Sequence, residues 1–230
     1  MTVSAIIPVA GQGKRFGGKT PKQFLKIGEQ SIIEMTLKKF ISLADINHGV
    51  VVVPENEIDF SEKIFRQIIG FDQKFKITSG GEERQDSVFN GLNKIPPDTD
   101  IVVVHDGVRP LVSSQLISQS IKTAIKTGAC IAALPVKETV KRVENGTVIE
   151  TIPRDQLWQV QTPQTFKYSV LKEAHERARM MTYYSTDESA LVEWNGHPVS
   201  VIPGEFKNIK ITTTADLELA RLLYQKVALS

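Results

Sequence analysis

The sequence predicts an α/β protein built on a mostly parallel central sheet. Apolar runs of strand length alternate along the chain with segments in which apolar residues recur every three or four positions. With 230 residues, 41% of them hydrophobic, the chain can bury a core without disulfides or a structural metal. No repeat, low-complexity stretch or linker interrupts this alternation, so we expect one domain over residues 1–230.

Five apolar runs are predicted as strands, and the amphipathic segments between and after them are predicted as helices. Each helical segment places its apolar residues on one face, as Leu217, Ala220 and Leu223 do in the last one. In chain order, the prediction is strand 3–9, helix 31–43, strand 49–54, helix 55–69, strand 74–79, helix 82–95, strand 100–105, helix 113–127, strand 129–136 and helix 214–228.

Residues 139–151 depart from this rhythm. Two short alternating stretches flank Asn145-Gly146, a pair that suits a type I′ turn, so we predict a β-hairpin. A two-stranded ribbon with few large apolar residues is marginally stable alone. The hairpin should therefore pack either against a second subunit or on the parent sheet.

Composition excludes several functional classes. The 28 Lys and Arg residues nearly balance 26 Asp and Glu residues, which argues against a surface devoted to nucleic acid. The lone Cys130 lies in an apolar run, which excludes an internal disulfide and fits a reducing compartment. The amino terminus has no basic region, and no window approaches the roughly 18 apolar residues of a membrane helix. We expect a cytoplasmic protein.

A glycine-rich segment follows the first strand. Residues 10–23 contain four glycines and four cations. Glycine lets backbone N–H groups approach an anion closely, and cations neutralise its charge, so this segment predicts phosphate binding. The alternative is a flexible surface loop.

Three phosphate-binding patterns can be compared with this segment. A dinucleotide fingerprint fails because Phe16 occupies its third glycine position. Residues 13–20 satisfy the P-loop pattern, and residues 101–106 resemble a strand ending in a magnesium aspartate. A P-loop needs a long helix at this point, but Pro21 disfavours helix at Thr20 and Gly28 ends any helix soon after. This argues against a P-loop NTPase, which we keep as an alternative. The third interpretation is a nucleoside triphosphate cradle made by residues 11–15 and 21–23.

Two further motifs face the same edge of the predicted sheet. Gly80-Gly81 opens a helix that carries Arg84. Asp106 and Arg109 follow a central strand at its carboxyl end, where ligands bind in open α/β sheets. Asp106 would hold Mg²⁺ or a ribose hydroxyl and Arg109 a phosphate, unless the two only form an ion pair that orders the turn. Alternation turns His105 away from Asp106 and indicates a structural role.

The motifs resemble, over nearly the whole chain, those of the sugar and polyol-phosphate cytidylyltransferase family. The matching segments are 10–15, 21–25, 80–88, 104–110, 153–155, 157–166, 186–190 and 208–212. The resemblance implies a Rossmann-like nucleotidyltransferase fold with helices on both faces of the sheet. It also implies a protruding hairpin arm over residues 137–156 that reaches a neighbouring subunit of a homodimer.

The resemblance implies transfer of CMP from CTP to the phosphate of 2-C-methyl-D-erythritol 4-phosphate, a step of the non-mevalonate isoprenoid pathway. The products would be 4-diphosphocytidyl-2-C-methyl-D-erythritol and pyrophosphate. Ribitol 5-phosphate is the alternative acceptor, and a non-catalytic nucleotide-binding module is the alternative outside enzymes. The implied cofactor is Mg²⁺, and the implied small-molecule partners are CTP and a polyol phosphate.

The resemblance also assigns residue roles. CTP would be bound by Ala10, Gly11, Gly13, Arg15, Lys22, Gly80, Gly81, Arg84, Ser87 and Asp106. The acceptor would be bound by Asp106, Arg109, Thr139, Arg154, Thr162, Thr186 and Lys210. Catalysis would rest on Arg15, Lys22, Arg154 and Lys210, and Asp106 would hold Mg²⁺ with the CTP phosphates.

The chain departs from the family's usual pattern in two motifs, at Val9 and at Gly107-Val108. The family writes A-A-G where this chain has Val9-Ala10-Gly11, and H-D-A-A-R-P where it has Gly107-Val108 after His105-Asp106. Both changes lie beside proposed functional atoms and leave the charged residues unchanged.

Overall fold

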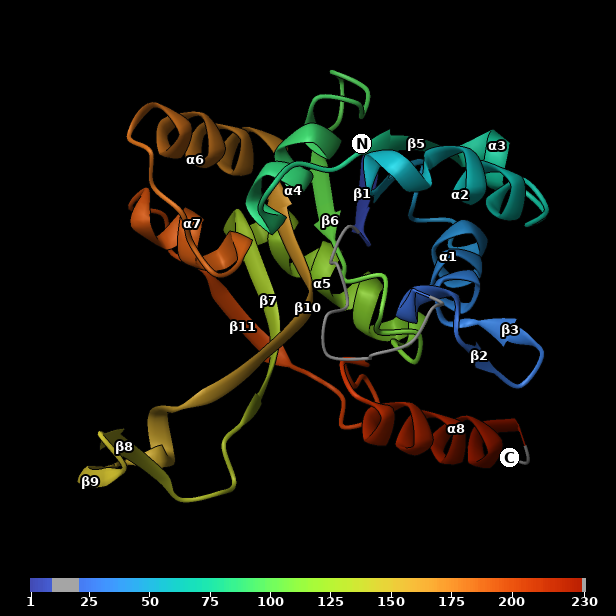
Figure 1. Cartoon of the computed structure of the whole chain (residues 1–230). Coiled ribbons are helices and arrows are strands. Elements are labelled where there is room, and N and C mark those ends of the chain that lie inside the picture. Colours follow the sequence, from blue (N-terminus) through green and yellow to red (C-terminus); the bar gives the residue numbers. More distant parts are fainter. Residues whose placement is uncertain (10–20, 229–230) are drawn as a thin grey trace.

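A computed structural model describes residues 1–9 and 21–228 of the chain. These residues form a seven-stranded sheet with helices on both faces (Figure 1). The strand order is β11 (Ser200–Pro203), β7 (Ala129–Pro135), β10 (Trp158–Lys167), β6 (Ile101–Val104), β1 (Val3–Pro8), β4 (His48–Val53) and β5 (Phe75–Ser79). Neighbouring strands are parallel except at β10, which runs antiparallel to both β6 and β7. The predicted mostly parallel sheet is confirmed.

Most helices divide between the two faces of the sheet and enclose a core on each, whereas the last helix packs in a third cluster with Ile32 and Met35. The helices are α1 (Ile32–Ser42), α2 (Ile58–Phe65), α3 (Phe71–Lys74), α4 (Arg84–Leu92), α5 (Ser114–Thr127), α6 (Tyr168–Met180), α7 (Glu188–Trp194) and α8 (Thr214–Ala228). On β1, Ala5 and Ile7 pack with α1, α2, α3 and α5, whereas Ile6 packs with α4, α6 and α7. A strand buried on both faces reads as a continuous apolar run, which is why β1 was predictable.

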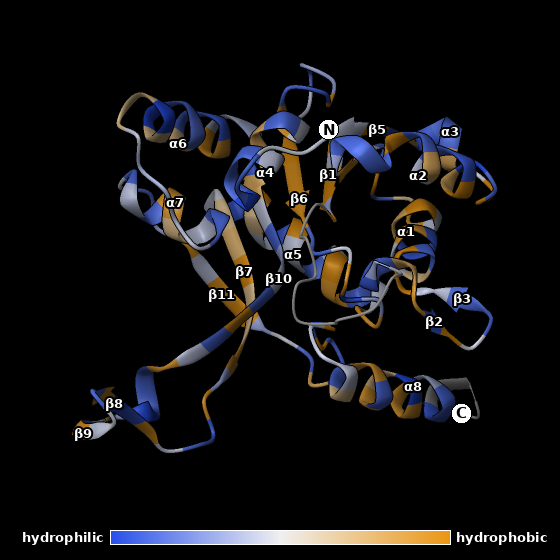
Figure 2. Cartoon of the chain, viewed as in Figure 1, coloured by the Kyte–Doolittle hydropathy of each residue, from blue (hydrophilic) through white to orange (hydrophobic). Residues whose placement is uncertain are grey.

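Two strands of the central sheet and three helices were not predicted. The missed strands are β10 and β11, and the missed helices are α3, α6 and α7. Figure 2 shows the reason for β10: it carries hydrophilic residues, whereas its neighbour β6 is hydrophobic. Gln164 and Thr165 of β10 are buried, and they hydrogen-bond to Asp187 and Ser120 respectively. Buried polar side chains are stable where each has such a partner, but their pattern does not resemble a core strand.

Short elements connect these larger ones. A two-stranded sheet joins β2 (Lys26–Ile27) to β3 (Gln30–Ser31), and single 3₁₀ turns form η1 (Lys22–Phe24), η2 (Glu55–Glu57) and η3 (Arg154–Gln156). The predicted helix 55–69 is therefore divided into η2 and α2.

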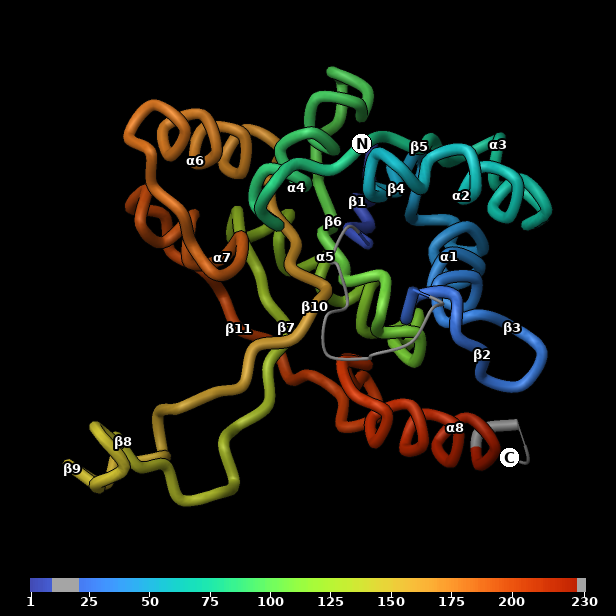
Figure 3. The backbone as a smooth tube through the Cα atoms, in the orientation of Figure 1, coloured from blue at the N-terminus to red at the C-terminus, as the bar shows by residue number. Residues whose placement is uncertain are grey.

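The predicted hairpin is present and stands apart from the central sheet. Strands β8 (Val140–Glu144) and β9 (Thr147–Ile152) pair with each other, and Asn145 and Gly146 have φ angles of 49° and 79°. Positive φ at both positions is what a type I′ turn requires. The hairpin projects away from the sheet (Figures 1 and 3), so it does not pack on the parent sheet. Its apolar residues Val143, Val148 and Ile149 are 53%, 55% and 54% exposed.

Val9 and Gly107, one residue from each of the two motifs that depart from the family pattern, are in contact. A Cβ atom added at Gly107 would lie 2.1 Å from Cγ1 of Val9 and 3.0 Å from Cδ1 of Ile33. The larger side chain at position 9 thus occupies the space left by the glycine at position 107. The two changes compensate each other.

Gly107→Ala alone is therefore expected to destabilise the protein by about 1–3 kcal/mol through overpacking. Val9→Ala alone is expected to cost about 1–2 kcal/mol because it leaves a void. In the double variant the new methyl group fills part of that void. Urea denaturation should show the double variant to be about 1–2 kcal/mol more stable than the sum of the single effects. Strict additivity would contradict the pairing.

Candidate active site

Asp106 is the centre of a charged cluster at the carboxyl end of β6. The residue is 6% exposed, and its carboxylate contacts three cations. Oδ1 lies 3.2 Å from Nη2 of Arg84, and Oδ2 lies 3.4 Å from Nε of Arg109 and 3.0 Å from Nζ of Lys210. These cations come from the start of α4, the loop after β6 and the segment before α8. The fold thus gathers four of the predicted site residues.

The charges of this cluster are fixed by its geometry. Burial alone would raise the pKa of Asp106, but Arg84, Lys210 and Arg109 hold that pKa well below its ordinary value. Asp106 is therefore ionised at neutral pH. Burial also raises the pKa of Glu188, and the guanidinium of Arg84 opposes this shift.

Arg84 is held by a second carboxylate. Its Nη1 donates to both carboxylate oxygens of Glu188, at 2.7 and 2.6 Å. Glu188 begins α7 and is 1% exposed. A hydrogen bond between charged groups in a buried setting fixes the arginine firmly. This role of Glu188 was not predicted, because the two residues are 104 positions apart and no local pattern links them.

The Gly80-Gly81 turn is shaped by Ser87. The Ser87 hydroxyl accepts a hydrogen bond from the Gly81 N–H at 3.1 Å and donates to the Glu83 carbonyl at 3.2 Å. A Cβ atom at Gly81 would lie 2.4 Å from Cβ of Asp86, so only glycine fits there. Ser87 therefore holds the turn, and its predicted contact with CTP remains a prediction.

A chain of hydrogen bonds sets the loop that carries Asp106. The Asp106 N–H donates to Oγ1 of Thr162 at 3.1 Å, and that hydroxyl also bonds to Nδ1 of His105 at 3.1 Å. Nε2 of His105 lies 3.1 Å from the Arg109 carbonyl, which can only accept, so Nε2 carries the proton. Burial lowers the pKa of His105 to about 4, so the ring is neutral at pH 7. His105 is structural, as predicted.

The segment before α8 is tied to the same loop. Nη1 of Arg109 donates to the Asn208 carbonyl at 2.8 Å, and Nδ2 of Asn208 donates to the Thr162 carbonyl at 2.7 Å. Asn208 is fully buried. Lys210, two residues further on, keeps 41% of its side chain exposed while it contacts Asp106. Its ammonium group can therefore reach a ligand.

No contact with the Asp106 carboxylate is seen for the other predicted site residues that the structure describes. Lys22 lies in η1 and is partly buried, and Thr186 is exposed just before α7. Thr139 and Arg154 are exposed on the hairpin arm, where Nη1 of Arg154 donates to the Lys137 carbonyl. Within one chain the arm, with β8 and β9, lies apart from β6, the strand that leads to Asp106 (Figure 3). The remaining predictions, which lie outside the described residues, concern Ala10, Gly11, Gly13 and Arg15.

Asp106 is a poor ligand for a metal held by protein groups alone. Both of its oxygens already contact cations, and the described residues contain no group of three or more His, Cys, Asp or Glu side chains that could hold a metal. Mg²⁺ commonly binds through one or two carboxylates together with substrate phosphates. Asp106 could join such a site only through an oxygen that already contacts a cation.

The fold and the cluster together define a nucleotidyltransferase. A mostly parallel sheet presents a glycine turn at the start of α4 beside three cations, at the edge where nucleotides bind. Comparison with known proteins makes the class more specific. A family model described as 2-C-methyl-D-erythritol 4-phosphate cytidylyltransferase matches residues 3–226, and the chain belongs to that family.

Individual relatives agree with this assignment. The enzyme of that name from Alkaliphilus oremlandii is 44% identical over 94% of this chain and 92% of the relative. The one from Clostridioides difficile is 43% identical, with 94% and 91% covered. A crystal structure of 4-diphosphocytidyl-2C-methyl-D-erythritol synthase from Anaerococcus prevotii superposes with a TM-score of 0.86, at 30% identity, covering 97% of this chain and 98% of that one. The predicted Rossmann-like nucleotidyltransferase fold and cytidylyltransferase class are confirmed.

Proposed function

We propose that the chain transfers CMP from CTP to the phosphate of 2-C-methyl-D-erythritol 4-phosphate. It is a cytidylyltransferase whose family serves the non-mevalonate isoprenoid pathway. The observation that carries the proposal is the anchoring of Asp106 among Arg84, Arg109 and Lys210 in a chain that matches the family from residue 3 to residue 226.

The reaction needs positioning and charge more than proton transfer. A phosphate oxygen of the acceptor attacks the α-phosphorus of CTP, a new P–O bond forms, and the bond to the bridging oxygen breaks to release pyrophosphate. The acceptor phosphate is anionic near neutral pH, so no side chain need act as a base. Cations must offset the repulsion of two polyanions in a partly dry site. We assign this role to Arg15, Lys22 and Lys210.

Asp106 would orient two of the groups that meet the acceptor. It holds Arg109 and Lys210 at 3.4 and 3.0 Å and leaves part of the Lys210 side chain exposed. Thr162 and Thr186 would line the polyol pocket. We propose that Asp106 and the CTP phosphates would together hold Mg²⁺, which would supply positive charge at the phosphates.

The arm would complete the site of a second copy in a homodimer. It projects away from the central sheet with Thr139 and Arg154 exposed on it, and it exposes Val143, Val148 and Ile149. Exposed apolar residues on a projecting ribbon fit a protein partner. We also propose a cytoplasmic location, because the buried thiol of Cys130 suits a reducing compartment. No helix in the described part of the chain is long and apolar enough to span a membrane.

Pyrophosphate release by the purified protein with CTP and Mg²⁺ tests the proposal. Release only with 2-C-methyl-D-erythritol 4-phosphate would support it. Release only with ribitol 5-phosphate would show that ribitol 5-phosphate is the acceptor and would leave the proposed mechanism unchanged. Phosphate release without an acceptor would favour a P-loop NTPase. CTP binding without any release would favour a nucleotide-binding module.

Arg154→Ala is expected to raise the acceptor KM by about 10- to 100-fold, the effect of losing one charged hydrogen bond to a phosphate. CTP affinity should stay nearly unchanged, because the proposal places Arg154 at the acceptor phosphate. Steady-state kinetics with each substrate varied in turn measures both effects. Arg142→Ala is the matched control, since Arg142 lies on the same arm and pairs with Glu150 at 3.1 Å. A fall in CTP affinity instead would show that the two phosphate sites are assigned wrongly.

A further inference from the structure

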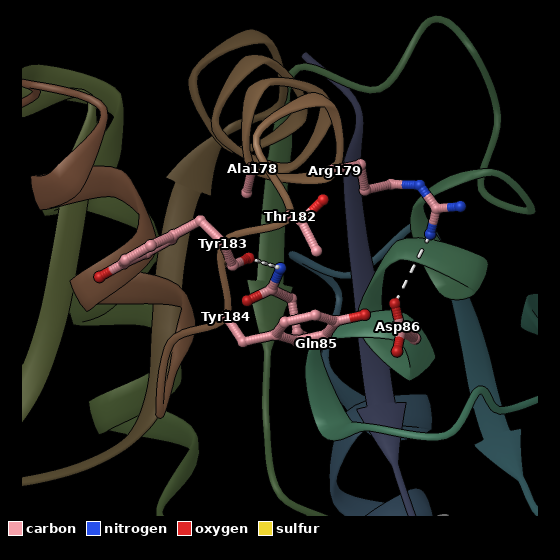
Figure 4. A pocket seen from close by; sticks show the side chains of 7 residues that line it. All are labelled: Gln85, Asp86, Ala178, Arg179, Thr182, Tyr183 and Tyr184. Carbon is pink, nitrogen blue, oxygen red and sulfur yellow. Dashed lines mark hydrogen bonds and ion pairs between the residues drawn. The ribbon is translucent and has the colours of Figure 1, made fainter.

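The amino end of α4 is hydrogen-bonded to the segment that precedes α7. The Gln85 side chain, 7% exposed, bonds to that segment through both atoms of its amide. Nε2 donates to the Tyr183 carbonyl at 3.0 Å, and Oε1 accepts from the Ser185 N–H at 3.0 Å. Figure 4 shows Gln85 pointing from α4 at this backbone. Beside it, Arg84 bonds to Glu188.

The segment is held from two sides: Gln85 binds its backbone from α4, and the ring of Tyr183 stacks on Trp194 of α7 with centroids 4.3 Å apart. A polar cavity of about 220 Å³ lies between α4 and the end of α6, and Gln85, Thr182 and Tyr184 are among the residues that line it (Figure 4). Tyr184 is 55% exposed. The carboxyl end of the segment is better fixed, because Asp187 caps α7. Gln85 therefore fixes the part of the segment that leads to Thr186.

Gln85 links two parts of the protein that would bind different substrates in the proposed function. Helix α4 begins just after the Gly80-Gly81 turn, which would face CTP. Thr186, one residue beyond the Ser185 N–H that Gln85 binds, would line the acceptor pocket. Because Gln85 bonds to the backbone on both sides of Tyr184, it sets the position of Thr186 relative to the Gly80-Gly81 turn that would bind CTP.

We propose that Gln85 is a positioning residue that places the acceptor-binding segment 183–186 against the CTP-binding end of α4. This inference rests on the proposed function. The amide is suited to the role because it supplies one donor and one acceptor at equal distance from the backbone. A carboxylate lacks the donor, and an alkyl group lacks both the donor and the acceptor.

Gln85→Leu removes both hydrogen bonds at nearly constant size. The acceptor KM is expected to rise about tenfold, as the loss of two neutral hydrogen bonds implies. CTP affinity, measured by calorimetry without acceptor, should change less than about twofold, because the Gly81–Ser87 bond remains. Calorimetric affinity for the acceptor alone should fall in parallel with the rise in KM.

Gln85→Glu provides a readout that lost stability would not change. The carboxylate cannot donate to the Tyr183 carbonyl, but the protonated acid can. Burial disfavours the charged form of such a carboxyl group and the guanidinium groups of Arg84 and Arg179 favour it, and the acid form becomes populated as pH falls. The acceptor affinity of this variant, relative to wild type at the same pH, should therefore rise as pH is lowered, and a ratio independent of pH would contradict the role of the Tyr183 bond.

Asn195→Ala is the matched control. Asn195 joins α6 to α7 by accepting from Arg177 at 3.0 Å and donating to Glu173 at 3.3 Å, without contacting segment 183–186. It should lower the melting temperature and leave acceptor affinity unchanged. Acceptor affinity within twofold of wild type in Gln85→Leu, or an equal loss of CTP affinity, would overturn the inference. Lack of turnover by wild type would refute the proposed function instead, and the calorimetric comparison, which needs no turnover, would still decide the inference.

Discussion

Lys22→Ala is expected to lower kcat by about 10²–10³, the cost of removing one group that stabilises the charge of a transition state. Lys22 lies in η1, near the end of the glycine-rich segment 10–23. As charge moves onto the departing pyrophosphate, its ammonium group would follow that charge, so the loss should appear in kcat more than in KM. Rapid-quench or steady-state measurement of pyrophosphate formation determines both constants. Arg15→Ala should behave in the same way.

Lys26→Ala is the control, because Lys26 lies four residues further on, is exposed, and has no role in the proposed mechanism. Lys19→Ala separates the proposal from the P-loop alternative. A P-loop lysine contacts the phosphates directly, so its removal would abolish activity, whereas a cytidylyltransferase should tolerate the change. A kcat within threefold of wild type for Lys22→Ala would remove this residue from the catalytic role.

Asp106→Asn is expected to destabilise the fold by about 3 kcal/mol at pH 7, because it leaves three cations around a neutral group. The estimate is at the low end for buried ion pairs, because Arg84 and Lys210 keep 30% and 41% of their side chains exposed and can be partly solvated. Urea denaturation of the ligand-free protein measures the loss as a lower midpoint with an unchanged slope.

The pH dependence of this loss has a defined sign. The pKa of Asp106 is lower in the folded protein than in the unfolded chain. Its stabilising contribution is therefore complete above the unfolded value of about 3.9 and declines as pH falls toward the folded value. The difference between wild type and Asp106→Asn should shrink below about pH 4. Asp98→Asn, an exposed carboxylate, should have almost no effect. Equal stability of Asp106→Asn and wild type at pH 7 would contradict this account of the cluster.

The parts of the fold that the sequence predicted are those set by local chemistry. Strand β1 is apolar on both faces, and Asn145-Gly146 is a turn pair whose backbone preference is built in. Strand β10 escaped prediction because its buried Gln164 and Thr165 depend on partners from distant segments. The sequence does not show which distant side chain will satisfy a buried amide.

The candidate site divides in the same way. Asp106 and Arg109 were found because the carboxyl ends of parallel strands are where ligands bind, and this rule needs only the order of elements. The contacts that fix Arg84 and the segment before α7 could not be found in that way. Glu188 pairs with Arg84 across 104 positions, and Gln85 bonds to Ser185 across 100. Contacts at such distances along the chain follow from the folded topology.

The contact between Val9 and Gly107 also restricts how this sequence could have diverged from relatives with alanine at both positions. Valine at position 9 beside an alanine at position 107 would require atoms to overlap at about 2 Å. Glycine at position 107 beside an alanine at position 9 leaves only a small void. The glycine is therefore the permissive change, and the valine is acceptable only after it or together with it. Lineages that carry glycine at 107 with alanine at 9 should be easier to find than lineages with the opposite combination.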